Sequence, residues 1–264
     1  MLPAMTHPDS ITLAVTLVVR DLDTVERFYR DVIGLHAVAR ERDSVAMGVD
    51  GTAFLHLRHE PQALRDDPAG AGLFHTAFLL PSRADLGGWL THADRAGLRL
   101  DGAADHLVSE AAYLRDPEGN GVEVYADRPR AGWSWRDGQV AMANDRLDGP
   151  GLRAAATAWQ GAPAGTRIGH VHLRVGDVAA ATRFYTGELK LDLVRAMPQA
   201  AFLSWGGYHH HIAVNTWGSA GAGPRLAGTA GLRSVAVQAA TDLLPVGAVT
   251  LHDPWGLPLH VSAV

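Results

Sequence analysis

One stretch of the sequence occurs twice and decides the fold. Leu17-Val18-Val19-Arg20-Asp21-Leu22, followed by Phe28-Tyr29, returns as Leu173-Arg174-Val175-Gly176-Asp177-Val178, followed by Phe184-Tyr185, at one constant offset. A repeated unit fixes an architecture before any single residue is interpreted. The chain therefore consists of two related halves.

Each copy of the repeat predicts a β-α-β-β-β unit. An apolar run, at 11–19 or 168–175, leads to Asp21 or Asp177, which can cap a helix that carries apolar residues at helical spacing. Short β-like runs then follow, at 45–48 and 53–57 in the first copy and at 201–205 and 209–214 in the second.

Two further units complete the series. The second unit predicts a strand at 73–80, a helix at about 84–96, a strand at 112–114, the turn Asp116-Pro117-Glu118-Gly119-Asn120-Gly121 and a last strand at 122–125. The fourth unit is a shortened copy with strands at 232–238, 249–251 and 259–261, the turn Asp253-Pro254-Trp255-Gly256, and only 239–247 in the place of a helix.

We therefore expect an α+β fold of four β-α-β-β-β modules, the fourth truncated. The chain should divide into a first domain at 1–127, an ordered linker at 128–166 with room for one short helix, and a second domain at 167–264.

Composition excludes several classes of protein. The chain has 264 residues, of which 47% are hydrophobic, a formal charge of −5 and a pI near 6.2, so it can bury a core and has no basic excess for nucleic acid. It lacks cysteine, so any metal must be held by nitrogen and oxygen donors, and 14 histidines can supply the nitrogen. We find neither a leader-like segment nor an apolar run of membrane-spanning length, and we expect a cytoplasmic protein that binds no nucleic acid and no membrane.

Histidines fall at the same place in the first strands of the second and third units. Aligning the two strands places His75 over His170, and Glu123 directly follows the Asp-Pro turn of the second unit. Two imidazoles and one carboxylate occupy one face of an octahedron and leave three positions open, which is typical of non-haem iron(II) oxygenases. A single histidine on an apolar strand is more often a hydrogen-bonded core residue, so the recurrence carries the metal hypothesis. His172 shares a face with His170 by period two and is expected beside the ligand or in its place.

The ligand positions also predict how the modules pair. The first and fourth units offer Ala14 and Ser234 at the histidine position, and His260 stands alone at the position of Glu123. We therefore expect the second and third units to form a metal-binding cup across the linker, and the first and fourth to form a metal-free cup. The truncated fourth unit lacks cover for its sheet, which favours a homodimer or higher oligomer.

The four-module order resembles the vicinal oxygen chelate superfamily of glyoxalases, bleomycin-resistance proteins and extradiol dioxygenases, in which paired units curl their sheets into open cups around a metal. The segment 105–123 resembles the signature of extradiol ring-cleaving dioxygenases through His106, Tyr113, the Asp116-Pro117-Glu118-Gly119 turn and Glu123, with departures at the packing positions Ala104 and Ala112. The segments 208–217 and 124–129 look like those of bacterial two-domain catechol 2,3-dioxygenase (CatE)-like proteins.

This resemblance implies roles for individual residues. His210, in the match to His-x-x-Ala-Val, would accept a substrate proton and return it later. Tyr113 would donate a hydrogen bond to the substrate oxygen, and His106 would orient or polarise that oxygen. His209 and His211 are expected on the opposite face of the strand and solvated, although either could replace His210.

The expected function is a metal-dependent extradiol dioxygenase that opens a catechol-like aromatic ring with O2. Its metal would be iron(II), with manganese(II) or another divalent metal as the alternative. A lyase or isomerase of the glyoxalase or epimerase kind remains open, in which the metal stabilises an enediolate. A metal-free binding or resistance protein for a small molecule is the third possibility. Asp127 and Arg128 are expected to form an ion pair at the end of the strand that carries Glu123, without a catalytic role.

Overall fold

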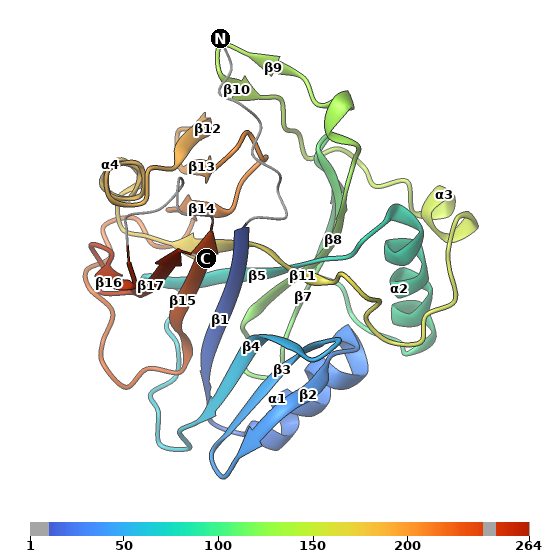
Figure 1. Cartoon of the computed structure of the whole chain (residues 1–264), viewed down its shortest axis with the longest axis horizontal. Helices are drawn as coiled ribbons and strands as arrows, with labels where there is room; N and C mark the ends of the chain where they lie inside the picture. The colour runs from blue at the N-terminus through green and yellow to red at the C-terminus, as the bar shows by residue number, and fades with distance from the viewer. Residues whose placement is uncertain (1–10, 240–246, 264) are drawn as a thin grey trace.

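The computed structural model describes residues 11–239 and 247–263. Fifteen of the strands in these residues belong to one continuous curled sheet, and the longer helices lie at its periphery (Figure 1). The predicted α+β class, built from β-α-β-β-β modules, is confirmed. No helix in the described part of the chain is long and apolar enough to span a bilayer.

The first two modules have the predicted element order. The first consists of β1 (Ile11–Val19), α1 (Leu22–Phe28), a π-helical turn (Tyr29–Ile33), β2 (His36–Glu41), β3 (Ser44–Val49) and β4 (Thr52–His59). The second consists of β5 (Gly72–Leu79), α2 (Arg83–Arg95), β6 (Gly102–Asp105), β7 (Ser109–Arg115) and β8 (Gly121–Asp127). Both helices begin after a short polar side chain that accepts a backbone hydrogen bond, Asp21 for α1 and Ser82 for α2.

The second half repeats this order after a connector. The connector contains a 3-10 turn (Arg130–Gly132), the ribbon of β9 (Trp135–Arg136) and β10 (Gln139–Val140), and the short helix α3 (Gly149–Ala154). The third module consists of β11 (Arg167–Arg174), α4 (Val178–Glu188), β12 (Asp192–Met197), β13 (Ala200–Ser204) and β14 (Ile212–Asn215). The fourth consists of β15 (Gly231–Ala239), β16 (Val249–His252) and β17 (Pro258–Ala263). The interval expected to lack a helix lies at 240–246, outside the described residues, and the division into two domains around 128–166 remains a proposal.

The first strands of the modules pair across the two halves of the chain. β1 runs antiparallel to β15, and β5 runs antiparallel to β11, as the neighbouring ribbons in Figure 1 show. The last strand of each module lies parallel to its own first strand, in the pairs β4 with β1, β8 with β5, β14 with β11 and β17 with β15. The predicted pairing of the second module with the third, and of the first with the fourth, is therefore confirmed.

The two repeated motifs, Phe-Tyr and Asp-Pro-x-Gly, contact each other in the folded chain. Tyr29 donates a hydrogen bond to Asp116 at 3.3 Å, and the equivalent Tyr185 donates to Asp253 at 3.3 Å. Each aspartate also accepts two backbone N–H bonds from its own turn. The motifs therefore fasten the helix of one module to the last hairpin of the next.

The main apolar core lies between the sheet and its helices. Trp89 of α2 is among the largest fully buried side chains, and its indole N–H donates to the Val32 carbonyl at 2.9 Å. Along β5, Phe78 joins this core whereas Ala77 belongs to a separate cluster on the opposite face. That opposite face carries His75, two residues before Ala77, because side chains alternate along a strand.

Candidate metal centre

The fold brings His75, His170 and Glu123 together. Glu123 Oε2 lies 2.9 Å from His75 Nε2 and 3.1 Å from His170 Nε2, and the two Nε2 atoms are 3.3 Å apart. All three side chains are buried. Among the described residues, they form the one cluster of three histidine or acidic side chains whose ligand atoms converge.

The strand register explains this convergence. In the antiparallel pair of β5 and β11, His75 lies opposite His172 and Ala77 lies opposite His170, so the two equivalent histidines are diagonal neighbours on one face. β8 runs parallel to β5 with Glu123 opposite Ala77, which places the carboxylate on the same face. The register of β5 with β11 shifts on both sides of this segment, and such irregularities bend strands locally.

The three donor atoms fit a single transition-metal ion. Ligands about 2.1 Å from a metal lie about 3.0 Å apart at a right angle and about 3.4 Å apart at a tetrahedral angle, which matches the observed separations of 2.9, 3.1 and 3.3 Å. Hydrogen bonds alone leave a conflict, because two imidazoles that both donate to the same Glu123 oxygen would crowd two N–H groups whose nitrogens are 3.3 Å apart. A cation between the three atoms removes this conflict, since each atom then presents a lone pair.

The charge states of these groups also suit a metal. Burial lowers the pKa of the His170 imidazole to about 4, so this ring is neutral near pH 7. Burial opposes the charge on Glu123, but the adjacent His170 and His75 outweigh it and hold the pKa of the carboxyl well below its ordinary value. A neutral imidazole and an ionised carboxylate are the forms that bind metal ions.

Within the part of the chain that the structure describes, the equivalent cup of the first and fourth modules has no such set of converging donors. Ala14 of β1 lies opposite Ala236 of β15, in the register that places His75 opposite His172. His260 lies opposite Ala236 as Glu123 lies opposite Ala77, but it is exposed and contacts the Thr250 hydroxyl. The two cups therefore have similar strand pairing, and the converging donors lie in the cup of the second and third modules.

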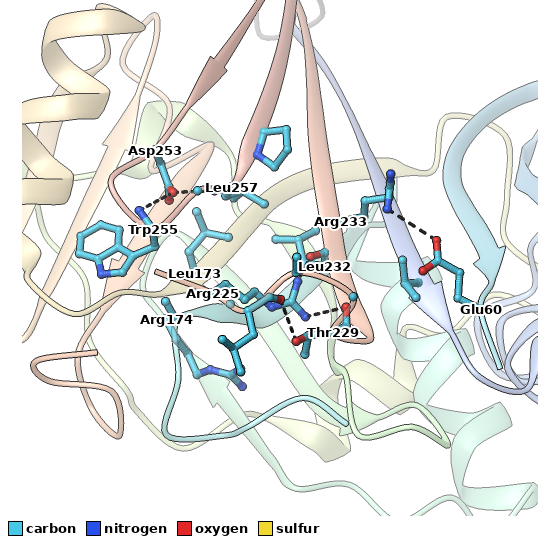
Figure 2. A pocket seen from close by; sticks show the side chains of 18 residues that line it. Glu60, Leu173, Arg174, Arg225, Thr229, Leu232, Arg233, Asp253, Trp255 and Leu257 are labelled. Atoms are coloured by element: carbon cyan, nitrogen blue, oxygen red, sulfur yellow. Dashed lines mark hydrogen bonds and ion pairs between the residues drawn. The ribbon is translucent and has the colours of Figure 1, made fainter. Parts of the chain in front are cut away.

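A pocket of about 230 Å³, separate from the three convergent donors, lies beside β15 and the Asp253 turn (Figure 2). Arg174 and Arg225 both pair with Asp66 there, at 2.5 and 3.3 Å, and Arg233 pairs with Glu60 at 3.6 Å. Arg225 also donates to the backbone carbonyls of Ala230, directly before β15, and of Leu232, within it. These charged side chains are therefore engaged in holding loops of the protein together.

A larger cavity, of about 520 Å³, opens on the metal-site residues. Phe74 and Trp217 line it, with ring centroids 5.2 Å apart, and the Phe74 ring lies 4.9 Å from that of His172. Trp217 is 49% exposed, so this aromatic wall runs from the metal site to solvent. The arrangement suits an aromatic ligand whose polar end reaches His75, His170 and Glu123.

His106 and Tyr113, both predicted at the site, line the same cavity and bind each other. His106 Nε2 lies 2.6 Å from the Tyr113 hydroxyl, and His106 Nδ1 lies 2.8 Å from the Ala143 carbonyl oxygen. A carbonyl only accepts hydrogen bonds, so Nδ1 carries a proton, and in a neutral His106 the bare Nε2 accepts a hydrogen bond from the Tyr113 hydroxyl. Burial and the nearby Glu123 raise the pKa of the Tyr113 hydroxyl well above its ordinary value, so it stays protonated.

The structure corrects the prediction for the three consecutive histidines. His209, His210 and His211 precede β14 instead of lying within it, so strict alternation of faces does not apply. All three are buried, which contradicts the expected solvation of His209 and His211. His210 lines the cavity, and its ring centroid lies 4.0 Å from that of His170.

His172 lies beside the three convergent donors and is not one of them. Its Nε2 accepts a hydrogen bond from the Asn215 amide at 2.9 Å. Its ring meets that of His75 edge-on, with centroids 4.9 Å apart. This geometry favours His170 over His172 as the candidate ligand of the third module.

The expected ion pair between Asp127 and Arg128 is wrong. Arg128 pairs with Asp105 at 2.5 Å and with Glu110 at 3.3 Å. Asp127 instead lies 2.9 Å from His209 Nε2. Sequence reasoning missed this contact because the two residues belong to different modules and no local pattern connects them.

Comparisons with known proteins show which family this chain is similar to. The model of the Glyoxalase/Bleomycin resistance protein/Dioxygenase superfamily matches residues 11–124 and 167–240. The chain is 39% identical over 233 residues to a catechol-2,3-dioxygenase of Bacillus subtilis (strain 168), covering 86% of this chain and 81% of that protein. It is 30% identical over 115 residues to biphenyl-2,3-diol 1,2-dioxygenase 3 of Rhodococcus globerulus, covering 40% of this chain and 57% of that protein. Glyoxalase I from Zea mays shares the fold with a TM-score of 0.55 at 16% identity, over 96% of this chain and 93% of that chain.

Proposed function

Because the chain belongs to the glyoxalase/bleomycin resistance protein/dioxygenase superfamily, we propose that it is a metal-dependent extradiol dioxygenase that opens a catechol-like ring with O2. The observation that carries this proposal is the buried His75, His170 and Glu123 set at the base of an aromatic-lined cavity. The catechol-2,3-dioxygenase relative supports the reaction class. Iron(II), or manganese(II) in its place, would supply a Lewis acid and redox centre with open positions for the substrate oxygens and dioxygen.

His210 is the proposed acid and base. A catechol must lose hydroxyl protons to chelate a cation, and a neutral imidazole beside the ligand set can accept one. Burial, with the neighbouring histidines, lowers the pKa of His210 well below its ordinary value, so its ring is neutral before the reaction. The protonated ring can then return the proton when the aromatic ring opens.

Tyr113 and His106 are proposed to orient the substrate. Because the Tyr113 proton points to His106, the Tyr113 oxygen offers its lone pairs to a substrate hydroxyl. This direction differs from the simple donor role that the sequence suggests. The Ala143 carbonyl fixes the His106 ring and thereby the direction of the Tyr113 hydroxyl.

The rival functions fit the site less well. A lyase that relies on a fourth protein ligand would need His210, but the convergent ligand atoms among the described residues belong to His75, His170 and Glu123 and do not include His210. A metal-free binding protein would bury the Glu123 carboxylate beside two imidazoles without using it, and a buried charge is costly. No observation favours the lyase or the metal-free binding protein over the dioxygenase.

The test is oxygen consumption with isotope labelling. Protein loaded anaerobically with iron(II) is mixed with a panel of catechols under ¹⁸O2, and we expect stoichiometric oxygen uptake, a yellow ring-opened product and two labelled atoms per product molecule. Glu123→Ala should lose both iron and activity. Asp94→Asn, which removes an exposed carboxylate paired with Arg153, is the matched control and should behave as wild type. Iron-loaded protein that consumes no oxygen with any catechol would refute the proposal.

A further inference from the structure

A chain of hydrogen bonds leads from His210 to the edge of the protein. His210 Nδ1 lies 2.7 Å from His209 Nδ1, and His209 Nε2 lies 2.9 Å from Asp127 Oδ1. The same carboxylate oxygen accepts a hydrogen bond from the Tyr208 hydroxyl at 3.2 Å. His209 is fully buried, whereas the Asp127 side chain is 23% exposed. These hydrogen bonds therefore connect the His210 ring, which lines the cavity, to the partly exposed Asp127 carboxylate.

Counting donors and acceptors fixes the direction of these bonds. A carboxylate only accepts, so His209 Nε2 carries a proton. If His209 and His210 each carry one ring proton, His209 Nδ1 is then a bare acceptor, and His210 Nδ1 must be the donor. His210 Nε2 is consequently left with its lone pair, and it is the ring nitrogen that remains for a ligand in the cavity. This is the tautomer that a proton acceptor requires.

We infer that Asp127 and His209 are positioning residues that hold His210 in the tautomer with a bare Nε2. The inference rests on the proposed function for its consequence in catalysis, and on the hydrogen-bond geometry of two singly protonated rings for the tautomer. When a substrate hydroxyl transfers its proton to His210 Nε2, the O–H bond breaks and an N–H bond forms. The resulting imidazolium keeps its Nδ1–H bond to His209, whose other nitrogen donates to the Asp127 carboxylate. A carboxylate that orients a catalytic imidazole through an N–H bond acts similarly in serine hydrolases.

The strand β8 supplies both carboxylates. Glu123, Tyr125 and Asp127 occupy alternate positions and therefore share one face of the strand. Since Tyr208 donates to Asp127, the Tyr125 hydroxyl donates to Tyr208, at 2.8 Å. The Tyr125 ring also contacts that of His170, with centroids 4.9 Å apart. One strand thus presents Glu123 to the metal site and Asp127 to the histidine pair, with Tyr125 packed between them.

The tautomer is directly measurable. In full-length protein labelled with ¹⁵N-histidine, long-range proton–nitrogen spectra recorded with and without zinc(II) distinguish the protonated from the bare ring nitrogen, and His210→Gln identifies the His210 signals. We expect His210 to carry its proton on Nδ1. In Asp127→Asn the amide can donate to His209 Nε2, which reverses every bond in the chain and moves the His210 proton to Nε2. A wild-type His210 protonated on Nε2, or an unchanged tautomer in Asp127→Asn, overturns the inference.

Kinetics with the iron-loaded protein separate positioning from a purely structural role. Asp127→Asn is expected to lower kcat by about 10- to 100-fold, with KM within about twofold and iron content unchanged, while Asp94→Asn keeps the wild-type kcat. Loss of iron, or a rise in KM alone, would contradict positioning. If Asp127→Asn fails to fold, the wild-type spectrum still decides the tautomer, and His209→Gln replaces the variant. A wild-type protein inactive on all catechols but with the expected tautomer would refute the proposed function and leave this inference standing.

Discussion

Replacing Gly169 by alanine is expected to disturb the metal site through a single methyl group. A Cβ at this position would overlap the Tyr125 hydroxyl and lie 2.8 Å from Tyr125 Cζ and 3.0 Å from Leu79 Cβ. Tyr125 is fully buried and bonded to Tyr208, so it cannot move without breaking that hydrogen bond. Overpacking costs about 1–3 kcal/mol and a lost buried hydrogen bond about 1 kcal/mol. We therefore expect the free energy of unfolding to fall by about 2–4 kcal/mol.

Urea unfolding of the metal-free protein measures this loss, and a double-mutant cycle assigns it. Tyr125→Phe removes the overlapping oxygen but leaves the Cζ contact. In the Tyr125→Phe background, Gly169→Ala should therefore lower the free energy of unfolding by less than it does in the wild type, but still by a measurable amount. Because the Tyr125 ring contacts His170, we also expect Gly169→Ala to weaken metal binding about tenfold. A Gly169→Ala protein within about 0.5 kcal/mol of wild type, with unchanged metal affinity, would refute the reasoning.

Three further predictions concern charge, ligation and the repeat. The pKa of His170 drops from 6.5 in the unfolded chain to about 4 in the folded protein, so the unfolded state binds more protons between these values. Stability of the metal-free protein, measured by urea unfolding, should therefore fall by about 3 kcal/mol for this group as the pH drops from about 6.5 to about 4, and a pH-independent stability would contradict it. Glu123→Gln should lower metal affinity by about 100-fold or more in calorimetric titration while the metal-free protein stays folded; equal affinity would exclude Glu123 as a ligand. Tyr29→Phe removes the bond to Asp116 and should cost about 1 kcal/mol in thermal or urea unfolding, whereas no loss would show that the bond is only incidental.

The elements were predictable because their signals are local. Asp21 and Asp177 cap the helices in the predicted places, and the Asp116 and Asp253 turns lie where the repeated Asp-Pro pattern indicates. The sequence also indicated how the modules pair, because the candidate ligands His75 and His170 stand on opposite sides of the connector. The main error in the third module, a strand at 209–214, arose because a run of histidines beside apolar residues mimics an alternating strand, whereas β14 begins only at Ile212.

The site was predictable in part. The sequence named His75, His170 and Glu123, and the structure brings their ligand atoms together; their roles in binding a metal remain predictions, as does the acid–base role of His210. The sequence assigned Asp127 to a contact with its neighbour Arg128, and the structure shows that contact to be wrong. An ion pair between adjacent residues is a local guess, and it cannot compete with a partner that the fold delivers from another module.

Repetition and spacing along the chain were enough to establish the modules, the halves and the three side chains with the chemistry of metal ligands, because periodicity, turn residues and ligand type are properties of short segments. The fold alone decided which donors meet at 2.9–3.3 Å and that His210 Nδ1 lies 2.7 Å from His209 Nδ1. These features depend on strand register and on hydrogen bonds between residues far apart in sequence, and register is an outcome of packing the whole sheet.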